Sequence, residues 1–251
     1  MIIADIIQAN NSTHQEVDNL MIDLQQKRIK DEIKDTLIFV EHPEIVTVGR
    51  RGMLDNLQAP DGFDSSSVDR GGGLTWHGPG QLVGYPIFRW KEESVRTVIT
   101  TIEEWIIQSL SVFGVTGVRN QSTQGVWFED YKVASIGLAF SKWVSRHGFD
   151  INLATPEGRI ESVEGCGLPL GKHTSLSKFD YNISINDEEI ILTVNRCTAY
   201  EHVRKLVGNV SPNFCDQTIK TNEALAEDTP YEIKTEILGE AACRQTIRKR
   251  A

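Results

Sequence analysis

Arg70-Gly71-Gly72-Gly73-Leu74-Thr75-Trp76-His77-Gly78-Pro79-Gly80-Gln81 is the most distinctive stretch of this chain. Its five glycines and one proline in twelve residues are not typical of an ordinary helix or a packed strand, because glycine loses much backbone entropy on ordering and proline has no N–H to donate. Such a run lets bare backbone approach a ligand closely. Arg70 and His77 add a fixed cation and a titratable imidazole, so we predict a binding loop here rather than an ordinary surface turn.

On the N-terminal side of this loop, the pattern predicts a strand, a helix and two further strands. Residues 1–8 are apolar and are interpreted as a first strand, and the capping box Thr13–Glu16 begins a helix. The short apolar runs at 37–40 and 45–48 are typical of buried strands. Residues 49–69 carry three glycines, a proline and mixed charge, so we expect a long mobile loop between 45–48 and the glycine-rich stretch.

On the C-terminal side, residues 83–88 predict a strand in which Pro86 occupies an edge or a bulge, because proline cannot donate to the ladder. Apolar residues that recur at steps of three and four predict a helix over 95–113. Residues 125–153 alternate in hydrophobicity and predict two or three antiparallel strands joined by short turns. Lys132 falls inside one of these predicted strands.

This order of elements predicts an α+β fold in which an antiparallel-rich mixed sheet packs with helices. It lacks the regular βαβ alternation of a Rossmann fold. We expect one catalytic domain over 1–215 and a C-terminal extension over 216–251. The extension is expected to be helical, because Thr229-Pro230-Tyr231-Glu232 has the capping pattern of a helix start, and Thr198 and Glu201 predict a further helix over 198–207 just before the extension.

Composition and charge exclude several classes of function. With 251 residues, 28.2 kDa and 39% hydrophobic residues, the chain suits one sizeable globular domain. A formal charge of −9 argues against nucleic-acid binding, and no apolar run approaches the roughly 20 residues of a membrane helix. The short apolar N-terminus contains Asp5 instead of a basic segment and is not typical of a signal peptide. We therefore expect a cytoplasmic protein with no nucleic-acid or membrane partner.

The four cysteines favour a reduced compartment and no structural metal. No two of them form a C-x-x-C pair, and the histidines lack the spacing of zinc hydrolases. One cysteine, Cys166, lies between Gly165 and Gly167, where a tight turn would leave its sulfur accessible. A cysteine becomes a good nucleophile only as the thiolate, which a nearby ammonium stabilises. Lys132 can supply that ammonium, or as a neutral amine it can take the thiol proton.

Each of these candidates has a structural alternative. Cys166 alone is equally compatible with a small core residue, and Lys132 with a solvated charge at a strand edge. His77 can hydrogen-bond a substrate carbonyl, and His147 can orient a loop or satisfy buried backbone. A Cys–His protease dyad is a further possibility, although no protease signature surrounds Cys166.

Several segments, in this order along the chain, resemble the lipoyl(octanoyl) transferases, which make protein-bound lipoate. The resemblance extends over about 36–182 and rests on Glu41-His42-Pro43, Gly49-Arg50, the stretch from Arg70 to Val83, Lys132-Val133-Ala134-Ser135-Ile136-Gly137, Trp143-Val144-Ser145-Arg146-His147-Gly148, Gly165-Cys166-Gly167 and Thr174-Ser175-Leu176. The chain departs from the family pattern at Trp76, where tyrosine is usual, at Gly165, where proline is common, and over 168–173.

The resemblance implies the fold of the biotin and lipoate ligases and a Cys166/Lys132 dyad. Cys166 would take an octanoyl group from octanoyl-acyl carrier protein as a thioester, and Lys132 would lower the thiol pKa. The acceptors would be apo lipoyl domains of 2-oxoacid dehydrogenase complexes and the glycine cleavage H protein. No ATP, cofactor or metal is implied. The implied substrate-binding residues are Arg70, Gly71, Gly72, Gly73, Leu74, Thr75, Trp76, His77, Ser135, Ile136, Gly137, Gly148, Phe149 and Asp150.

Two other functions stay open on the sequence. An ATP-dependent lipoate or biotin ligase would share the fold without needing Cys166, and a non-catalytic module would bind an acyl carrier or lipoyl domain. Because the protein partners of such an enzyme are acidic and this chain is acidic too, we also predict a local basic rim. The candidates for this rim are Arg50, Arg51, Arg70, Lys142 and Arg146.

Overall fold

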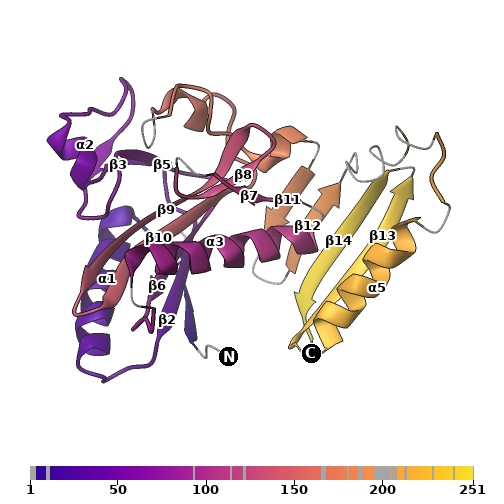
Figure 1. Cartoon of the computed structure of the whole chain (residues 1–251), viewed down its shortest axis with the longest axis horizontal. Coiled ribbons are helices and arrows are strands. Elements are labelled where there is room, and N and C mark those ends of the chain that lie inside the picture. The colour runs from indigo at the N-terminus through magenta and orange to yellow at the C-terminus, as the bar shows by residue number, and fades with distance from the viewer. Residues whose placement is uncertain are drawn as a thin grey trace. The chain divides into compact units, whose positions relative to one another are not determined.

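The computed structural model of the chain forms two compact units (Figure 1). The structure describes residues 4–9, 12–92, 94–113, 115–120, 123–164, 168–179, 181–185, 189–194, 204, 208–211, 214–227, 229–239 and 241–250. Unit 1 comprises residues 1–107 and 117–175, and unit 2 comprises 108–116 and 176–251. Compactness thus divides the chain near residue 175.

Unit 1 is built on a seven-stranded sheet. Its strands, in spatial order, are β1 (Asp5–Gln8), β2 (Thr36–Val40), β6 (Gln81–Ile87), β10 (Val144–Asn152), β9 (Tyr131–Ser141), β8 (Val126–Phe128) and β7 (Val118–Arg119). Every neighbouring pair is antiparallel except β1 with β2. The predicted α+β class with an antiparallel-rich mixed sheet is therefore confirmed, as are the strands expected in 125–153.

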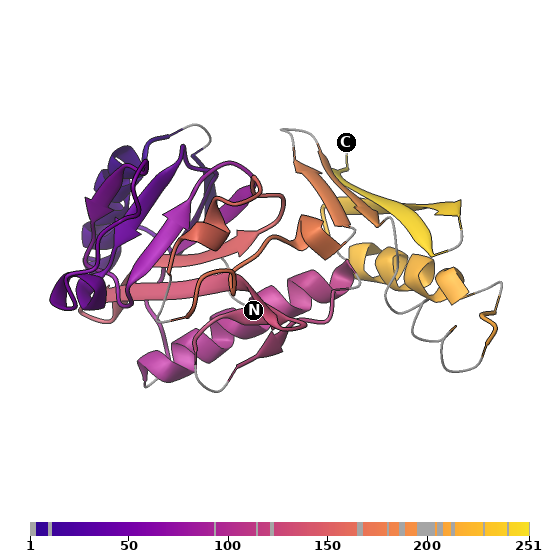
Figure 2. The same ribbon diagram turned by 90° about the horizontal axis from the view of Figure 1, so that it is seen from above.

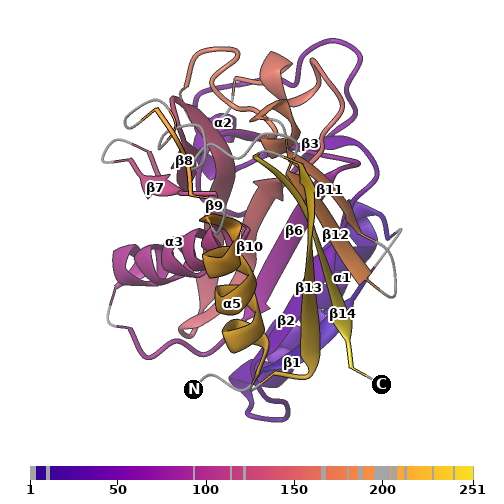
Figure 3. The ribbon, with the colours of Figure 1, turned by 90° about the vertical axis from the view of Figure 1, so that its right-hand side faces the viewer.

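Two helices cover opposite faces of this sheet, as the two rotated views show (Figures 2 and 3). Helix α1 (His14–Ile29) begins at the predicted capping box, in which the Glu16 N–H donates to Thr13 Oγ1 and the Thr13 N–H donates to Glu16 Oε2 at 2.8 Å. Helix α3 (Val95–Val112) lies on the other face and confirms the helix predicted over 95–113. Its buried residues recur at helical spacing, as an amphipathic helix requires.

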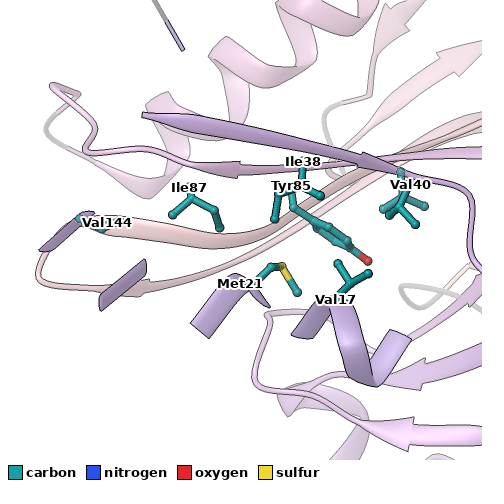
Figure 4. Close-up of a cluster of buried hydrophobic side chains, with 8 residues drawn as sticks. Val17, Met21, Ile38, Val40, Tyr85, Ile87 and Val144 are labelled. Atoms are coloured by element: carbon teal, nitrogen blue, oxygen red, sulfur yellow. The ribbon is translucent and has the colours of Figure 1, made fainter. Parts of the chain in front are cut away.

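The core beneath α1 is apolar and continuous across the sheet (Figure 4). Val17 and Met21 point from α1 toward Ile38 on β2 and toward Tyr85 and Ile87 on β6. Burying each large apolar side chain stabilises the fold by about 1.5–3 kcal/mol. This cluster holds α1 against β6, the strand that leaves the glycine-rich stretch.

A second, three-stranded sheet in unit 1 has the order β4 (Ser65–Ser67), β3 (Ile45–Val48) and β5 (Leu74–His77). Strand β5 corrects the expectation that the glycine-rich stretch contains no packed strand. Its four non-glycine residues pair antiparallel with β3, and the side chains of Leu74 and Trp76 are buried against Val46 and Val48. The predicted loop over 49–69 is also partly regular, because it contains β4 and the short helix α2 (Arg50–Leu54).

Strand β6 is an interior strand, so the expectation of an edge position for Pro86 is wrong. On one side, β6 pairs with β2 as far as Ile87. On the other side, its pairing with β10 runs from Gln81 to Gly84 and stops before Pro86. The missing N–H of proline therefore falls where this ladder is already interrupted.

Unit 2 contains a four-stranded antiparallel sheet in the order β11 (Tyr181–Ile185), β12 (Glu189–Val194), β14 (Ala242–Lys249) and β13 (Tyr231–Gly239). It also contains helix α5 (Phe214–Glu227) and a 3₁₀ turn, η2 (Leu176–Phe179). A further 3₁₀ turn, η1 (Ile160–Ser162), belongs to unit 1. Among the described residues, no helix has the length and apolarity needed to cross a membrane.

The helix predicted from Thr229 is wrong, and β13 forms instead. The Thr229 hydroxyl accepts the Tyr231 N–H at 3.2 Å and so closes a local turn, not a helical cap. Beyond it, apolar and charged residues alternate with the period of two that a strand requires. The C-terminal extension is thus helical only in α5, and the helix expected over 198–207 lies outside the described residues apart from Arg204.

Met21→Ala is expected to lower the free energy of unfolding by about 2–5 kcal/mol, because the lost side chain leaves a cavity between α1 and the sheet. Met21 is completely buried, whereas the adjacent Ile22 is 42% exposed. Urea denaturation followed by circular dichroism measures the difference. Ile22→Ala is the matched control on the same helix, and equal losses in the two variants would contradict this account of the core.

Candidate active site

The Arg70 guanidinium ties the glycine-rich stretch to strand β3. Its Nη2 donates to the backbone oxygen of Thr47 at 2.9 Å and to Thr47 Oγ1 at 2.8 Å. Its Nη1 donates to the backbone oxygens of Gly71 at 2.9 Å and Gly73 at 3.2 Å. Because these donors are engaged within a buried environment, Arg70 anchors the loop and does not belong to an exposed basic rim.

Glycine is needed where α2 approaches this loop. A Cβ at Gly49 would lie 2.5 Å from the backbone oxygen of Gly72, and Gly72 itself has a φ of 89°, which side-chain-bearing residues rarely adopt. The Gly49 N–H donates to Gly73 O at 2.9 Å and the Arg51 N–H to Gly72 O at 3.1 Å. The loop therefore has one conformation, set by backbone contacts on both sides.

This loop, strands β5, β6, β9 and β10 and helix α1 enclose a cavity of about 420 Å³, including the part that is open to solvent. Most of the predicted substrate-binding residues line it, namely Arg70, Gly71, Thr75, His77, 135–137 and 148–150. The structure adds lining residues that the sequence did not single out: His14, Val83 and Tyr85. His147, which the sequence left as a loop-orienting residue, also lines the cavity.

A second cavity of about 240 Å³ shares the wall formed by Thr75, Ser135 and Asp150. Leu74 and Trp76, two further predicted residues, line it together with Ile160, Val163 and His173. Trp76 is buried, and its indole N–H donates to Glu44 at 3.0 Å. Gly72 and Gly73 line neither of these two cavities.

Lys132 lies on β9 and is only 1% exposed, so the alternative of a solvated charge at a strand edge is wrong. Its N–H donates to Lys172 O at 2.9 Å, and its carbonyl accepts the Thr174 N–H at 3.1 Å. Among the described residues, its ammonium has no hydrogen-bond or ion-pair partner. A cation held rigidly in this way is available to a neighbouring anion.

The predicted nucleophile Cys166, with Gly165 and Gly167, lies outside the described residues. The chain on either side of this segment lies in unit 1. Val163 lines the second cavity before it, and His173, which pairs with Lys132 in a parallel bridge, lines the same cavity after it.

Asp150 is a buried carboxylate on β10, opposite Ser135 of β9. The Ser135 N–H donates to its Oδ1 at 3.2 Å. Burial raises the pKa of Asp150 to about 7, although the Lys132 cation, the Ser135 hydrogen bond and the Arg70 cation each oppose that rise. Near neutral pH this carboxyl group therefore exists in both protonation states.

Three imidazoles cluster at one end of the larger cavity. The ring centroids of His14, His42 and His77 lie 5.4–6.1 Å apart. Burial lowers the pKa values of His14 and His42 to about 4 and holds the pKa of His77 well below its usual range. His42 Nδ1 donates to Ser12 O at 3.3 Å, so its Nε2 accepts the Tyr85 hydroxyl at 2.9 Å. The cluster is thus neutral and does not bring positive charge to the cavity.

Arg146 is also unavailable for an exposed basic rim. Its guanidinium pairs with Asp69 and with Asp18, and Asp69 accepts in turn from His147 Nε2 at 2.8 Å. Arg50, Arg51 and Lys142 are exposed, as the predicted rim requires. The rim is therefore reduced to these three residues, with Arg50 and Arg51 together on α2.

Comparison with known protein families identifies the family to which this chain belongs. The model of the lipoyl protein ligase A/B catalytic domain matches residues 18–184, which include every strand of the two sheets of unit 1 except β1. The chain belongs to this family. The family resemblance seen in the motifs is thereby confirmed.

Curated relatives in the family carry the name octanoyltransferase. The protein from Syntrophobacter fumaroxidans is 36% identical over 213 residues, which cover 82% of this chain and 90% of the relative. The protein from Nitratidesulfovibrio vulgaris is 32% identical over 71% of this chain and 86% of its own length. The protein from Dictyoglomus turgidum is 39% identical over 71% of this chain and 80% of its own length.

Two solved structures share the fold. A bipartite lipoate protein ligase from Thermoplasma acidophilum superposes with a TM-score of 0.52 at 13% identity, covering 74% of this chain and 78% of that one. P. falciparum LipL1 in complex with lipoate gives 0.52 at 14% identity, covering 90% of this chain and 63% of that one. At such identities the likeness establishes the fold alone, and it confirms the predicted biotin/lipoate ligase-like architecture.

The buried histidines predict a loss of stability in acid. Unfolded histidines take up protons below about pH 6.5, whereas folded His14 and His42 do so only near pH 4, so stability falls as the pH decreases from 6.5 towards 4. His14→Gln is expected to flatten this dependence by about 1.4 kcal/mol per pH unit between pH 6 and 5. Urea denaturation across this range measures the slope, and the exposed neighbour Gln15→Ala should retain the wild-type value. An unchanged slope in His14→Gln would show that His14 is protonated in the folded state.

Proposed function

We propose that this chain transfers an octanoyl group from octanoyl-acyl carrier protein to a lysine of apo lipoyl domains, through a thioester on Cys166 and without ATP. The observation that carries the proposal is the pairing of a cavity lined by the family's motif residues with a buried, rigidly held Lys132 beside it. The acceptors are lipoyl domains of 2-oxoacid dehydrogenase complexes and the glycine cleavage H protein. The reaction takes place in the cytoplasm, where cysteine thiols stay reduced.

In the first half-reaction, the Cys166 thiolate attacks the donor thioester carbonyl and the carrier's thiolate leaves. An isolated thiol is only a few per cent ionised at neutral pH, so a fixed cation is the chief requirement for this step. Lys132 can supply that cation, because its buried side chain lies close enough to the cavity walls for its charge to lower the pKa of both Asp150 and His173. In the second half-reaction, the acceptor amine attacks the octanoyl thioester and Cys166 leaves as the thiolate.

Chain connectivity supports Cys166 as the nucleophile. Val163 lines the second cavity and precedes Cys166 by three residues, which span at most about 11 Å. Lys132 forms a parallel β-bridge with His173, which follows Cys166 by seven residues. Both flanks of the cysteine segment are therefore fixed next to the cavity wall that carries Ser135 and Asp150.

The larger cavity suits an acyl chain. Its volume of about 420 Å³ lies in the range typical of small-molecule sites. Val83, Ile136 and Phe149 supply apolar walls, and the imidazoles of His14 and His77 are neutral. The Arg70 cation is engaged by loop carbonyls, so the octanoyl tail meets little unpaired charge there.

Mass spectrometry tests the proposed function directly. The intact protein is mixed with octanoyl-acyl carrier protein, and then with an apo lipoyl domain, in the absence of ATP and metals. We expect an octanoyl increment on the enzyme that moves to the lipoyl domain, and no increment in Cys166→Ser. Transfer that requires octanoate and ATP would instead identify an ATP-dependent ligase and refute the covalent route.

Lys132→Ala is expected to slow acylation at pH 7 by about 100-fold and to shift the pH–rate profile to higher pH, because the thiol loses the cation that stabilises its thiolate. Stopped-flow or quenched acylation rates between pH 6 and 9.5 measure both effects. The exposed Lys142→Ala serves as the control and should retain the wild-type profile. A Lys132→Ala profile that keeps its midpoint would remove Lys132 from thiol activation.

Helix α2 presents a surface suited to an acidic carrier protein. Arg50 and Arg51 are exposed there, next to the exposed apolar side chains of Met53 and Leu54. Opposite charges across a rim mainly raise the rate of encounter and its salt dependence.

The double variant Arg50→Glu/Arg51→Glu is expected to raise the KM for octanoyl-acyl carrier protein about tenfold and to weaken its salt dependence. Octanoyl-pantetheine, which lacks the carrier protein, is the matched control substrate and should react at the wild-type rate. Equal effects on both substrates would place these arginines in the chemistry and not in docking.

A further inference from the structure

Asp150 is a buried carboxylate that the thiol chemistry does not use. Among the described residues that line the two cavities, it is the one acidic side chain, and it forms part of the wall that both cavities share. Its Oδ1 accepts the Ser135 N–H, which fixes the carboxylate on the rigid β9–β10 pair. A carboxylate in this position meets whatever enters either cavity.

The second half-reaction needs a group of this kind. A lysine ε-amine has a pKa near 10.4, so roughly one in two thousand acceptor molecules carries the neutral, nucleophilic amine at pH 7. The attacking lysine therefore arrives as a cation and must lose a proton before it can form an amide.

We propose that Asp150 binds the ε-ammonium of the acceptor lysine and takes its proton, which makes it a catalytic residue of amide formation. This inference rests on the octanoyl transfer proposed above and adds the base that the Cys166/Lys132 dyad does not supply. In this division of roles, Lys132 serves the leaving thiolate and Asp150 serves the incoming amine.

The proposed step balances in atoms and charge. The ammonium N–H bond breaks, and its proton moves to the Asp150 carboxylate, which leaves a neutral amine and a carboxylic acid. The amine nitrogen then forms the C–N bond at the thioester carbonyl, and the C–S bond breaks with its electron pair staying on Cys166. The second nitrogen proton passes to water, which leaves Cys166 as the thiolate, and Asp150 later returns its own proton to water.

The surroundings of Asp150 favour this role over that of the other titratable groups. Lys132 and Ser135 face Asp150 from β9, and Tyr85 faces it from β6. Arg70, Thr75 and His77 face it from the loop and β5, and His173 faces it from the segment after Cys166. The pKa values of His77 and His173 are lowered by burial, that of His173 to about 3, so both are weak bases. Burial raises the pKa of Tyr85, which stays protonated. A carboxyl group whose pKa is about 7 is the one best matched to accept a proton at neutral pH.

Single-turnover measurements on Asp150→Asn separate the two half-reactions. The variant is first loaded by octanoyl-acyl carrier protein, and the acyl-enzyme is then mixed with either an apo lipoyl domain or hydroxylamine. Hydroxylamine is largely unprotonated at neutral pH and needs no base. We expect the variant still to be loaded, and transfer to the lipoyl domain to be slowed about 100-fold more than transfer to hydroxylamine.

The pH dependence of the transfer rate is a second test, because a merely structural role of Asp150 would not affect it. Wild-type transfer to the lipoyl domain should rise as Asp150 loses its proton and level off above about pH 7.5, whereas the Asp150→Asn rate should keep rising in proportion to hydroxide. The exposed Asp130→Asn is the matched control and should follow the wild type. If Asp150→Asn does not fold, the wild-type profile with the lipoyl domain still decides the matter: a rate that levels near pH 7.5 supports the proposal, and a rate that rises in proportion to hydroxide up to pH 9 overturns it.

The outcomes are distinguishable from failure of the proposed function. Absence of any acyl-enzyme in the wild type would refute octanoyl transfer through Cys166. Folded Asp150→Asn that loads and transfers to the lipoyl domain at the wild-type rate would overturn the role of Asp150 and leave octanoyl transfer standing. Loss of loading in Asp150→Asn, or equal slowing with hydroxylamine, would also overturn it.

Discussion

The bonds of the Arg70 guanidinium organise the site. One buried cation satisfies the carbonyl oxygens of Thr47, Gly71 and Gly73, and so it joins strand β3 to a stretch that has too few side chains to pack by itself. Hydrogen bonds from a charged donor contribute more to stability than neutral ones, and a buried carbonyl left without a donor is costly. The loop can therefore adopt one conformation, and the wall of the larger cavity follows from it.

The second constraint is electrostatic. Unit 1 buries Lys132, Asp150 and several imidazoles around one cavity, although each charge costs free energy when removed from water. The imidazoles avoid this desolvation free energy because they stay neutral. Lys132 and Asp150 resolve it in part through each other, since the Lys132 cation lowers the pKa of a carboxyl group that burial raises. Such opposed environments are typical of groups that move protons or stabilise transient anions.

The fold itself does not decide between transfer and ligation. Lipoate ligases share this architecture at 13–14% identity, whereas relatives at 32–39% identity over most of the chain are named octanoyltransferases. The difference must lie in the residues of the site, because one architecture can carry several chemistries. A buried lysine, together with a glycine-flanked cysteine in the sequence, is the feature of this chain that favours covalent transfer.

The sequence by itself determined the local elements and the family. The capping box of α1, the helical spacing of α3 and the alternation of β9 and β10 depend on neighbouring residues, and all were predicted. Alternation after Thr229 was present too, but the capping pattern outweighed it and the prediction of a helix there was wrong. Strand β5 was missed because its pairing partner, β3, lies more than twenty residues away, and propensity does not register such distant pairing.

Only the tertiary structure decided how the candidate residues are used. It turned the predicted rim cations Arg70 and Arg146 into a buried, hydrogen-bonded cation and a half-buried, ion-paired one, and it brought His14 and Tyr85 into a cavity wall that no local pattern marks. It also buried Lys132 close enough to Asp150 for its charge to lower the pKa of that carboxyl group. Burial and the distance between charges are properties of the folded chain, because they arise from segments far apart in sequence, and the pKa of a side chain follows from them.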